Sequence, residues 1–179
     1  MIIRFVIGIL DRLFAVAGVI IFTQIPVFYQ QYVQRLSGHL SELELQVSVL
    51  RKTASRSGKT LEAYITKFIR DPDADFNAQG QFMDNMVNRL VDLKQSFTAM
   101  VEAPIWSHPL YLFRYADSDI AWTTFGSFEP GLSFSIESLG YAFVGLIFGL
   151  GVFKLIRWAF LSILRFGRNK YGTVKTAQS

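Results

Sequence analysis

Two apolar stretches, each long enough to cross a membrane, lie near opposite ends of this 179-residue chain, at residues 1–28 and 132–153. Their few charged residues are Arg4, Asp11, Arg12 and Glu137. A hydrocarbon core about 30 Å thick needs roughly 20 apolar residues in a helix. The chain between the two stretches is polar and charged, as in a domain that faces water. The pattern therefore predicts an all-α membrane protein with two antiparallel transmembrane helices that flank one extramembrane domain.

The polar region carries apolar residues at the spacing of a coiled coil. A first series follows steps of four and three through Tyr29, Val33, Leu36, Leu40, Leu43, Val47, Leu50 and Ala54. A second series consists of Met86, Leu90, Leu93, Phe97 and Met100, with Phe82 one turn earlier. Each seam needs another helix to cover it. Two seams joined by a turn favour an antiparallel coiled-coil-like helical hairpin, although the seams could also close between two chains.

Breaks in the pattern set the expected boundaries. The expected helices span residues 3–28 with a continuation to 56, then 60–69, 78–102 and 134–155 with an extension to 164. Ser57-Gly58 and Pro104 end two of them, and Ser133 or Ser135 caps the last. The predicted organisation is transmembrane helix 1 (1–28), hairpin domain with an aromatic return segment (29–131), transmembrane helix 2 (132–164) and a basic tail (165–179).

Basic residues that follow the second span predict the topology. They account for much of the net charge of +4 and are Lys154, Arg157, Arg165, Arg168, Lys170 and Lys175. Positive loops stay on the cytoplasmic side, so we expect a bacterial inner-membrane protein with cytoplasmic termini and a periplasmic domain at residues 29–131. The tail could also contact anionic lipid headgroups. Asp11 and Arg12 interrupt the apolar core that a signal peptide requires, which favours an uncleaved anchor.

The return segment, residues 103–131, is dense in aromatic side chains. They are Trp106, Tyr111, Phe113, Tyr115, Trp122, Phe125 and Phe128. Aromatic residues are enriched where a membrane meets water. They would serve equally well as a plug at the base of the hairpin, and the sequence does not distinguish these two roles.

Small and polar residues form stripes on both predicted spans. The residues expected to pack the spans together are Gly8, Asp11, Gly18, Gly145, Gly149 and Arg157. Small residues let two helix backbones approach closely inside a membrane. Asp11 is expected to pair with Arg157 or Lys154, because an ionisable residue near lipid seeks a partner. The alternative is that Asp11 and Arg12 lie at the level of the headgroups.

Signals for catalysis or metal binding are weak. His39 and Glu42 are one helical turn apart, but charged flanks of a heptad helix are usually a solvated face. The spacing of Asp71, Asp73, Asp75 and Asn77 resembles a calcium loop, yet Phe76 and Phe82 replace its glycine and bidentate glutamate. The chain has no cysteine, which excludes thiolate catalysis and disulfides. We therefore expect no enzyme, no metal and no cofactor.

Four segments resemble an uncharacterised bacterial inner-membrane family, domain of unknown function 2937. They are Tyr32-Val-Gln-Arg-Leu-Ser-Gly-His-Leu40, Leu61-Glu-Ala-Tyr-Ile65, Phe128-Glu-Pro-Gly-Leu132 and Glu137-Ser-Leu-Gly-Tyr-Ala142. The family often has Gly-Gly-His at the position of Ser37-Gly38-His39, and a proline near Gly131-Leu132. The resemblance implies the same membrane architecture, and it implies no activity.

A contact surface is expected close to the end of the first span. Its candidate residues are Gln31, Gln34, Arg35, Gly38 and His39. A glycine inside a helix costs about 1 kcal/mol relative to alanine, so Gly38 suggests a close approach by another backbone, from this chain or from a partner.

These features favour a non-enzymatic inner-membrane scaffold or accessory subunit of a larger membrane assembly. It would interact through its periplasmic helical hairpin and through the small-residue faces of its transmembrane helices. Its partners would be the lipid bilayer and another membrane protein or a second copy. The alternatives are a membrane-anchored ligand sensor or transport accessory and, remotely, an enzyme that uses His39. A nucleic-acid partner is not expected, because acidic residues slightly outnumber basic ones between residues 29 and 131.

Overall fold

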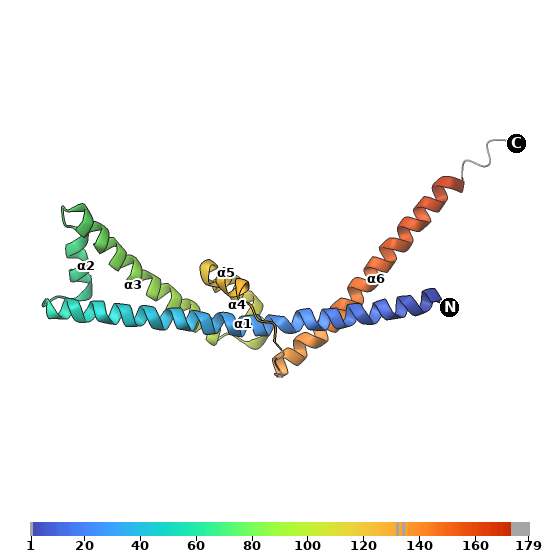
Figure 1. Ribbon diagram of the computed structural model, residues 1–179, viewed down its shortest axis with the longest axis horizontal. Helices are drawn as coiled ribbons and strands as arrows, with labels where there is room; N and C mark the ends of the chain where they lie inside the picture. The colour runs from blue at the N-terminus through green and yellow to red at the C-terminus, as the bar shows by residue number, and fades with distance from the viewer. Residues whose placement is uncertain (1, 132, 134, 173–179) are drawn as a thin grey trace. The chain divides into compact units, whose positions relative to one another are not determined.

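A computed structural model describes residues 2–131, 133 and 135–172, and their side chains at 5–131, 133 and 135–162. Regular structure in this part of the chain is entirely helical (Figure 1). The elements are α1 (Ile2–Arg56), α2 (Leu61–Ile69), α3 (Ala74–Val101), the 3-10 helix η1 (Ile105–Ser107), α4 (His108–Tyr115), α5 (Ser118–Gly126) and α6 (Ile136–Gly172). The predicted all-α class is confirmed.

The chain divides into two compact units. The first, here called the membrane unit, consists of Met1–Val27 and Pro130–Ser179. The second, here called the polar unit, consists of Phe28–Glu129. Helix α1 contributes to both units, because it continues through Pro26 without interruption.

The membrane unit contains the apolar parts of two long helices. Helical segments Phe5–Arg56 and Ile136–Ser162 each include a window that is long and apolar enough to cross a membrane. Few side chains in these windows are buried by the rest of the chain. A core helix of a soluble protein would instead bury its apolar surface against neighbours. These two helices support the prediction of a membrane protein.

Helix α6 begins at Ile136, after a serine cap. The Ser138 backbone N–H donates a hydrogen bond of 3.1 Å to the Ser135 hydroxyl, which confirms one of the two predicted caps. The predicted starting residue, Phe134, and the domain boundary at Leu132 lie outside the described residues, as does the tail from residue 173 onwards.

Helix α1 ends where the sequence predicts, in a glycine-dependent turn. Gly58 has a φ angle of 69°, in the left-handed region that glycine adopts without strain. The Lys59 N–H donates to the Ala54 carbonyl at 3.1 Å, and the Gly58 N–H donates to the Ser55 carbonyl at 3.0 Å. These two bonds form a Schellman motif, which satisfies carbonyls left free at a helix end.

The acidic turn between α2 and α3 consists of capping residues. The Asp75 N–H donates a 2.9 Å bond to the side chain of Asp73, the N-cap of α3. The Asp73 N–H donates in turn to the Asp71 side chain at 3.0 Å, and the Asn77 amide donates to the Ile69 carbonyl. The side-chain oxygens of Asp71 and Asp73 thus start α3, four residues earlier than the predicted Ala78.

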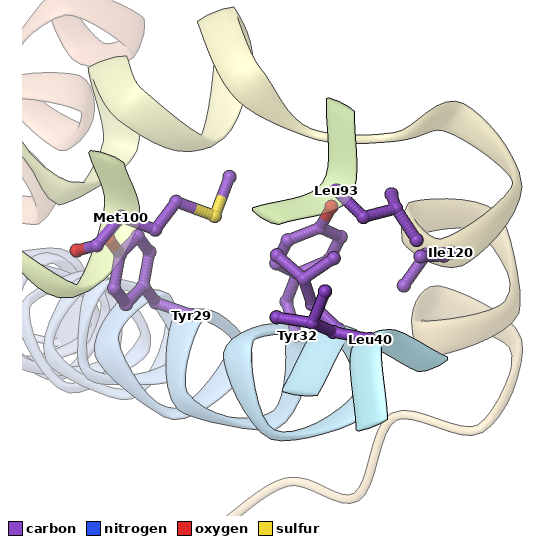
Figure 2. Packing of buried hydrophobic residues seen from close by; sticks show 7 residues of the cluster. Tyr29, Tyr32, Leu40, Leu93, Met100 and Ile120 are labelled. Atoms are coloured by element: carbon purple, nitrogen blue, oxygen red, sulfur yellow. The ribbon is translucent and has the colours of Figure 1, made fainter. Parts of the chain in front are cut away.

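Two buried clusters hold the polar unit together. One joins α1, α3 and α5 through Tyr29, Tyr32, Leu36, Leu40, Leu93, Met100 and Ile120 (Figure 2). The other joins α1, α2 and α3 through Val47, Leu61, Ile65 and Met83. Most first-seam positions on α1 are therefore buried or half-buried, as the seam requires.

Helix α2 changes the packing where the end of α1 connects to the beginning of α3. It lies across from the end of α1 to the beginning of α3, and the two long helices diverge towards it (Figure 1). Met83 is 5% exposed and contacts this second cluster, whereas Phe82 is 61% exposed. The predicted seam position at Phe82 is therefore wrong, because α2 covers a different face of α3 from the one that pairing with α1 alone would bury.

Candidate functional site

An open groove on the polar unit brings together all five residues of the predicted contact surface. It has a volume of about 790 Å³ and is lined by Gln31, Gln34, Arg35, Gly38, His39, Glu42, Ser127 and Glu129. Successive turns of α1 form one wall, and the segment that follows α5 forms the other. We call this feature the Arg35 groove.

The side-chain amide of Gln31 fixes the second wall. Its nitrogen donates a 2.7 Å hydrogen bond to the Glu129 carbonyl, and its oxygen accepts a 3.3 Å bond from the Glu129 N–H. One amide thus satisfies both backbone groups of a residue that lies outside any helix. This pair of bonds holds the chain after α5 against α1.

Arg35 connects the same two walls one turn further along α1. One of its guanidinium nitrogens donates to the Ser127 hydroxyl, which itself donates a 2.9 Å bond to the Thr123 carbonyl in α5. A guanidinium carries five N–H donors in a rigid fork. Arg35 can therefore hold Ser127 with one nitrogen and offer other donors to a ligand or partner in the groove.

Gly38 and His39 lie on the exposed surface of the groove. A Cβ atom built on Gly38 meets nothing within 4 Å. No described part of the chain therefore makes the close backbone approach that a glycine at this position suggests. Position 38 leaves a bare strip of helix backbone between Gln34 and Glu42.

The groove places His39, Glu42 and Ser127 near one another, but it does not connect them as catalytic residues. Ser127 is bonded to Arg35 and Thr123, and Glu42 accepts a 2.9 Å bond from Gln46. Among the described side chains, no hydrogen bond joins His39 to Glu42 or to Ser127. A nucleophile–base relay is built on such a bond, and the described side chains do not form one here.

Close backbone contact occurs between α1 and α6 in the membrane unit. A Cβ on Gly18 would lie 2.2 Å from the Gly145 carbonyl oxygen, and one on Gly149 would lie 2.2 Å from the Phe14 carbonyl oxygen. Such distances leave no room for any side chain. Aromatic pairs flank the crossing, with ring centroids 5.6 Å apart for Phe14–Phe153 and 5.2 Å for Phe22–Phe148.

Three other residues predicted to pack the spans do not take part in this crossing. A Cβ on Gly8 meets nothing within 4 Å. Ion pairs among the described side chains are Arg89–Asp117 and Lys94–Glu44, so Asp11 pairs with neither Arg157 nor Lys154 in this arrangement. The reason is geometric, because α1 and α6 cross at the glycines and then diverge towards the N-terminus of α1 and the C-terminus of α6 (Figure 1).

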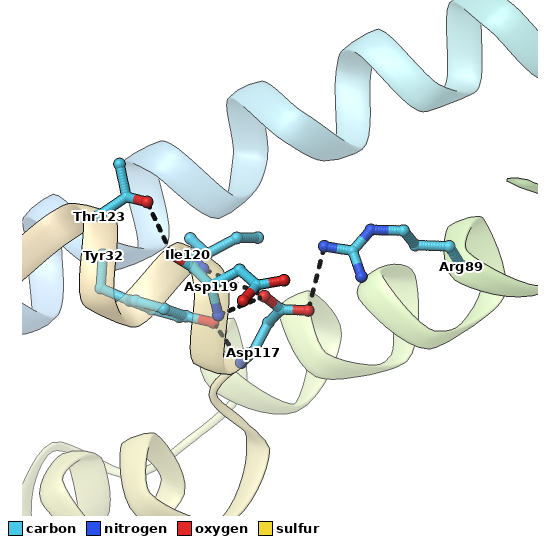
Figure 3. A network of polar contacts seen from close by, with 6 residues as sticks. All are labelled: Tyr32, Arg89, Asp117, Asp119, Ile120 and Thr123. Atoms are coloured by element: carbon cyan, nitrogen blue, oxygen red, sulfur yellow. Dashed lines mark hydrogen bonds and ion pairs between the residues drawn. The ribbon is translucent and has the colours of Figure 1, made fainter.

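A polar network that the sequence did not reveal joins α5 to α1 and α3 (Figure 3). Asp117 caps α5, accepting 3.1 Å bonds from the N–H groups of Asp119 and Ile120. Its carboxylate also forms a 3.2 Å ion pair with Arg89 of α3. Its own N–H donates a 2.9 Å bond to the hydroxyl of Tyr32, a fully buried residue of α1. Asp117 thus ties α5 to both long helices, and the only sequence signal was an aspartate before a helix.

Comparison with known proteins places most of the chain in one family. The model of a family described as "Protein of unknown function (DUF2937)" matches residues 6–167, which include the Arg35 groove and both apolar helices. Neither the curated proteins nor the solved structures contain a match to this chain.

Proposed function

Because this chain belongs to the DUF2937 family, whose description assigns no activity, we propose a function from its own geometry. The protein acts as a non-enzymatic scaffold or accessory subunit of a larger membrane assembly. The Arg35 groove is the surface through which it binds another protein of that assembly. The glycine crossing of α1 and α6 serves the internal packing of the membrane unit.

The observation that carries this proposal is the bare helix backbone at Gly38. A glycine inside α1 destabilises the helix by about 1 kcal/mol relative to alanine. None of the residues that the structure describes uses the space, because a Cβ there meets none of their atoms within 4 Å. A backbone or bulky side chain of a partner that enters between Gln34 and Glu42 would account for the glycine. The neighbouring amide, guanidinium and carboxylate groups would supply directional hydrogen bonds to that partner.

The proposal includes an orientation for the protein. The polar unit is an antiparallel helical hairpin of α1 and α3, it lies in the bacterial periplasm, and both termini are cytoplasmic. Basic residues after the second span support this topology. Two reporter enzymes should be fused in turn at the exposed turn residue Gly58, one that works only in the periplasm and one that works only in the cytoplasm. We expect activity from the periplasmic reporter alone. Activity of a cytoplasmic reporter at the same residue would reverse the orientation.

The exposed aromatics weigh against a ligand sensor. A sensor would line an enclosed apolar pocket with the aromatic residues of the return segment. In this structure Trp106 is 85% exposed and Phe113 is 92% exposed, so these rings do not line an enclosed cavity. The unconnected His39 likewise gives no support to an enzyme.

The mass of the intact particle tests the proposed function. The protein should be extracted from its native membrane inside polymer-bounded lipid discs and measured by native mass spectrometry. The expected protein mass exceeds that of one 20.4 kDa chain. The Gly38→Trp variant fills the groove and should return the particle to the mass of a single chain.

A matched control separates groove binding from general disturbance of α1. Lys52 is exposed on the same helix and does not line the groove. Lys52→Trp should keep the larger mass. A wild-type particle that contains one chain alone, or a Gly38→Trp particle that keeps its partner, would contradict the proposal.

A further inference from the structure

The strongest unexplained surface outside the groove is a set of large apolar side chains on η1, α4 and α5. Its members and their exposed fractions are Trp106 (85%), Leu110 (64%), Phe113 (92%), Trp122 (76%) and Phe125 (67%). We call them the aromatic face. They all belong to the polar unit, which elsewhere exposes single apolar side chains on its long helices, such as Leu45, Val49 and Val91. The aromatic face differs from these in containing two tryptophans and two phenylalanines on short helices.

Each short helix has one face that packs and one face that does not. In α5, Ile120 and Thr124 are buried, whereas Trp122 and Phe125 are exposed and stack with ring centroids 6.0 Å apart. In α4 and η1, the exposed Trp106, Leu110 and Phe113 follow steps of four and three. Such spacing places apolar residues on one side of a helix. The exposed sides of α4 and α5 therefore carry large apolar side chains together with a few polar ones, such as Arg114 and Asp119.

We propose that the aromatic face inserts into the interfacial layer of the same bilayer that α1 and α6 cross. Tryptophan and phenylalanine on short amphipathic helices are the side chains that partition into the layer between headgroups and acyl chains. Interfacial helices of this kind bury their apolar side by about 5–10 Å and leave their polar side in water. The occupant of this surface is lipid, a different partner from the protein proposed for the Arg35 groove.

Chain connectivity limits how far the aromatic face can lie from lipid. Helix α5 ends at Gly126 and the membrane-spanning α6 begins at Ile136. The intervening residues 127–135 reach at most about 30 Å when fully extended, since each adds roughly 3.3–3.6 Å. Residues 127 and 129 of this connection are held against α1 by Arg35 and Gln31, which shortens its reach further.

Contacts at the other end of the face restrict it in the same way. Tyr29, which directly follows the apolar stretch of α1, stacks on His108 at the start of α4 with centroids 4.0 Å apart. The Tyr29 hydroxyl also donates a 2.8 Å bond to the Met100 carbonyl in α3. The beginning of α4 is therefore fixed to the residues of α1 nearest the span. Both ends of the return segment are thus tied to chain that adjoins a membrane helix.

The charges around the aromatic face predict the headgroup charge of the lipids into which it inserts. Arg114 lies beside Phe113, and Asp119 lies one turn before Trp122, so charges of both signs adjoin the rings. A surface that relies on anionic lipid carries clustered lysine and arginine instead. Insertion should therefore be as deep in purely zwitterionic phosphatidylcholine as in mixtures with phosphatidylglycerol.

Tryptophan quenching by brominated lipid tests the proposal on the full-length protein. The chain contains three tryptophans, and Trp158 lies on α6. Quenching of Trp158 by lipid therefore serves as the control for successful reconstitution. Three single-tryptophan proteins are made by replacing the other two residues with phenylalanine. Each is reconstituted into phosphatidylcholine vesicles brominated either near the headgroups or near the bilayer centre.

The expected result is strong quenching of Trp106 and of Trp122 by shallow bromines, weaker quenching by deep ones, and protection from aqueous acrylamide. The proposal is overturned if acrylamide quenches both residues while lipid quenches only Trp158, because the face would then lie in water. It is also overturned if neither reagent quenches Trp106 and Trp122, because a protein would then cover them. Loss of the partner at the Arg35 groove should leave the quenching unchanged, which separates this inference from the proposed function.

Discussion

The hydroxyl oxygen of Tyr32 accepts a 2.9 Å hydrogen bond from the backbone N–H of Asp117, a residue that is far away in the sequence. Tyr32 is completely buried on α1, and Asp117 caps α5 and pairs with Arg89 on α3. This bond is one of several that fix the return segment to α1, and the Arg89 pair of the same residue adds a link to α3. The packing of the Arg35 groove wall depends on it, because α5 leads directly into Ser127.

Tyr32→Phe should destabilise the polar unit. The ring still fills its place, but the partly buried Asp117 N–H loses its acceptor, and the loss of one hydrogen bond costs about 0.5–1.5 kcal/mol. The free energy of unfolding, measured by denaturation in mild detergent, should fall by that amount. Tyr64→Phe is the control, because the Tyr64 hydroxyl has no hydrogen-bond partner among the described residues. Equal effects of the two substitutions would contradict the role given to Tyr32.

The stability of the protein should fall at alkaline pH partly through Tyr32. Burial raises the pKa of Tyr32 above its ordinary value of 10.0. The folded state therefore holds the phenolic proton more tightly than the unfolded state does. This contribution is fully present below pH 10.0, and it is lost as the pH rises through the higher pKa of the folded state. Subtracting the pH profile of Tyr32→Phe from that of the wild type should isolate this decline, and parallel profiles would exclude it.

Substitutions at Asp117 should separate its cap from its ion pair. Asp117→Asn keeps a side-chain acceptor for the first turn of α5 and loses only the pair with Arg89. That pair is worth about 0–1 kcal/mol, because the Arg89 side chain is half exposed. Asp117→Ala also loses the cap, which adds about 0.5–2 kcal/mol. Unfolding curves should therefore rank wild type above Asn and Asn above Ala, and an alanine variant as stable as the asparagine variant would show that the cap contributes nothing.

Gly18→Leu should separate α1 from α6 and lower the melting temperature in detergent. A Cβ at this position would lie 2.2 Å from a backbone carbonyl of the other helix, so the backbones must move apart. Gly8→Leu is the matched control on the same helix, because its Cβ meets nothing within 4 Å. Its melting temperature should equal that of the wild type or exceed it. Tolerance of leucine at position 18 would mean that the crossing is not a close one.

Alanine at two helical glycines of the polar unit should act in opposite directions. At Gly80 of α3 a Cβ would lie 2.5 Å from the backbone nitrogen of Ile69, so Gly80→Ala should destabilise the corner between α2 and α3 by about 1–3 kcal/mol. At Gly38 a Cβ meets no atom, so Gly38→Ala should stabilise the isolated protein by about 1 kcal/mol. Denaturant midpoints of the purified variants measure both effects. A loss of stability in Gly38→Ala would reveal an internal role for that glycine.

Local signals predicted much of the fold. Residues only a few positions apart determine the end of α1 before Gly58, the short helix up to Ile69 and the Ser135 cap. The first seam also predicted the buried face of α1, from Tyr29 to Ala54, because a helix fixes the direction of each residue by its spacing. The seam of α3 was correct from Met86 onwards and failed at Phe82. Its failure came from α2, whose position no local pattern specifies.

The candidate site was only half predictable. Gln31, Gln34, Arg35 and Gly38 share one stripe of α1, so spacing alone grouped them. The opposite wall comes from Glu129, 98 positions along the chain from its partner Gln31, and a contact at that separation leaves no periodic trace. The tie between Asp117 and Tyr32 is hidden for the same reason. The sequence also did not predict which aromatic rings of α4 and α5 are exposed. Their exposure depends on which face of each helix packs against the buried cluster.

Conservation of glycine among related chains would mean different things at positions 38 and 80. Position 80 excludes a side chain for a reason internal to the fold, since the backbone of Ile69 occupies the space. At position 38 the described part of the fold gives no such reason, because none of its atoms lies within 4 Å of the added Cβ. Among related chains, glycine kept at 80 would report only that the α2–α3 corner is preserved. Conservation of glycine at position 38 would indicate that a second molecule occupies this space. Its replacement in one lineage would indicate that the partner was lost or exchanged in that lineage.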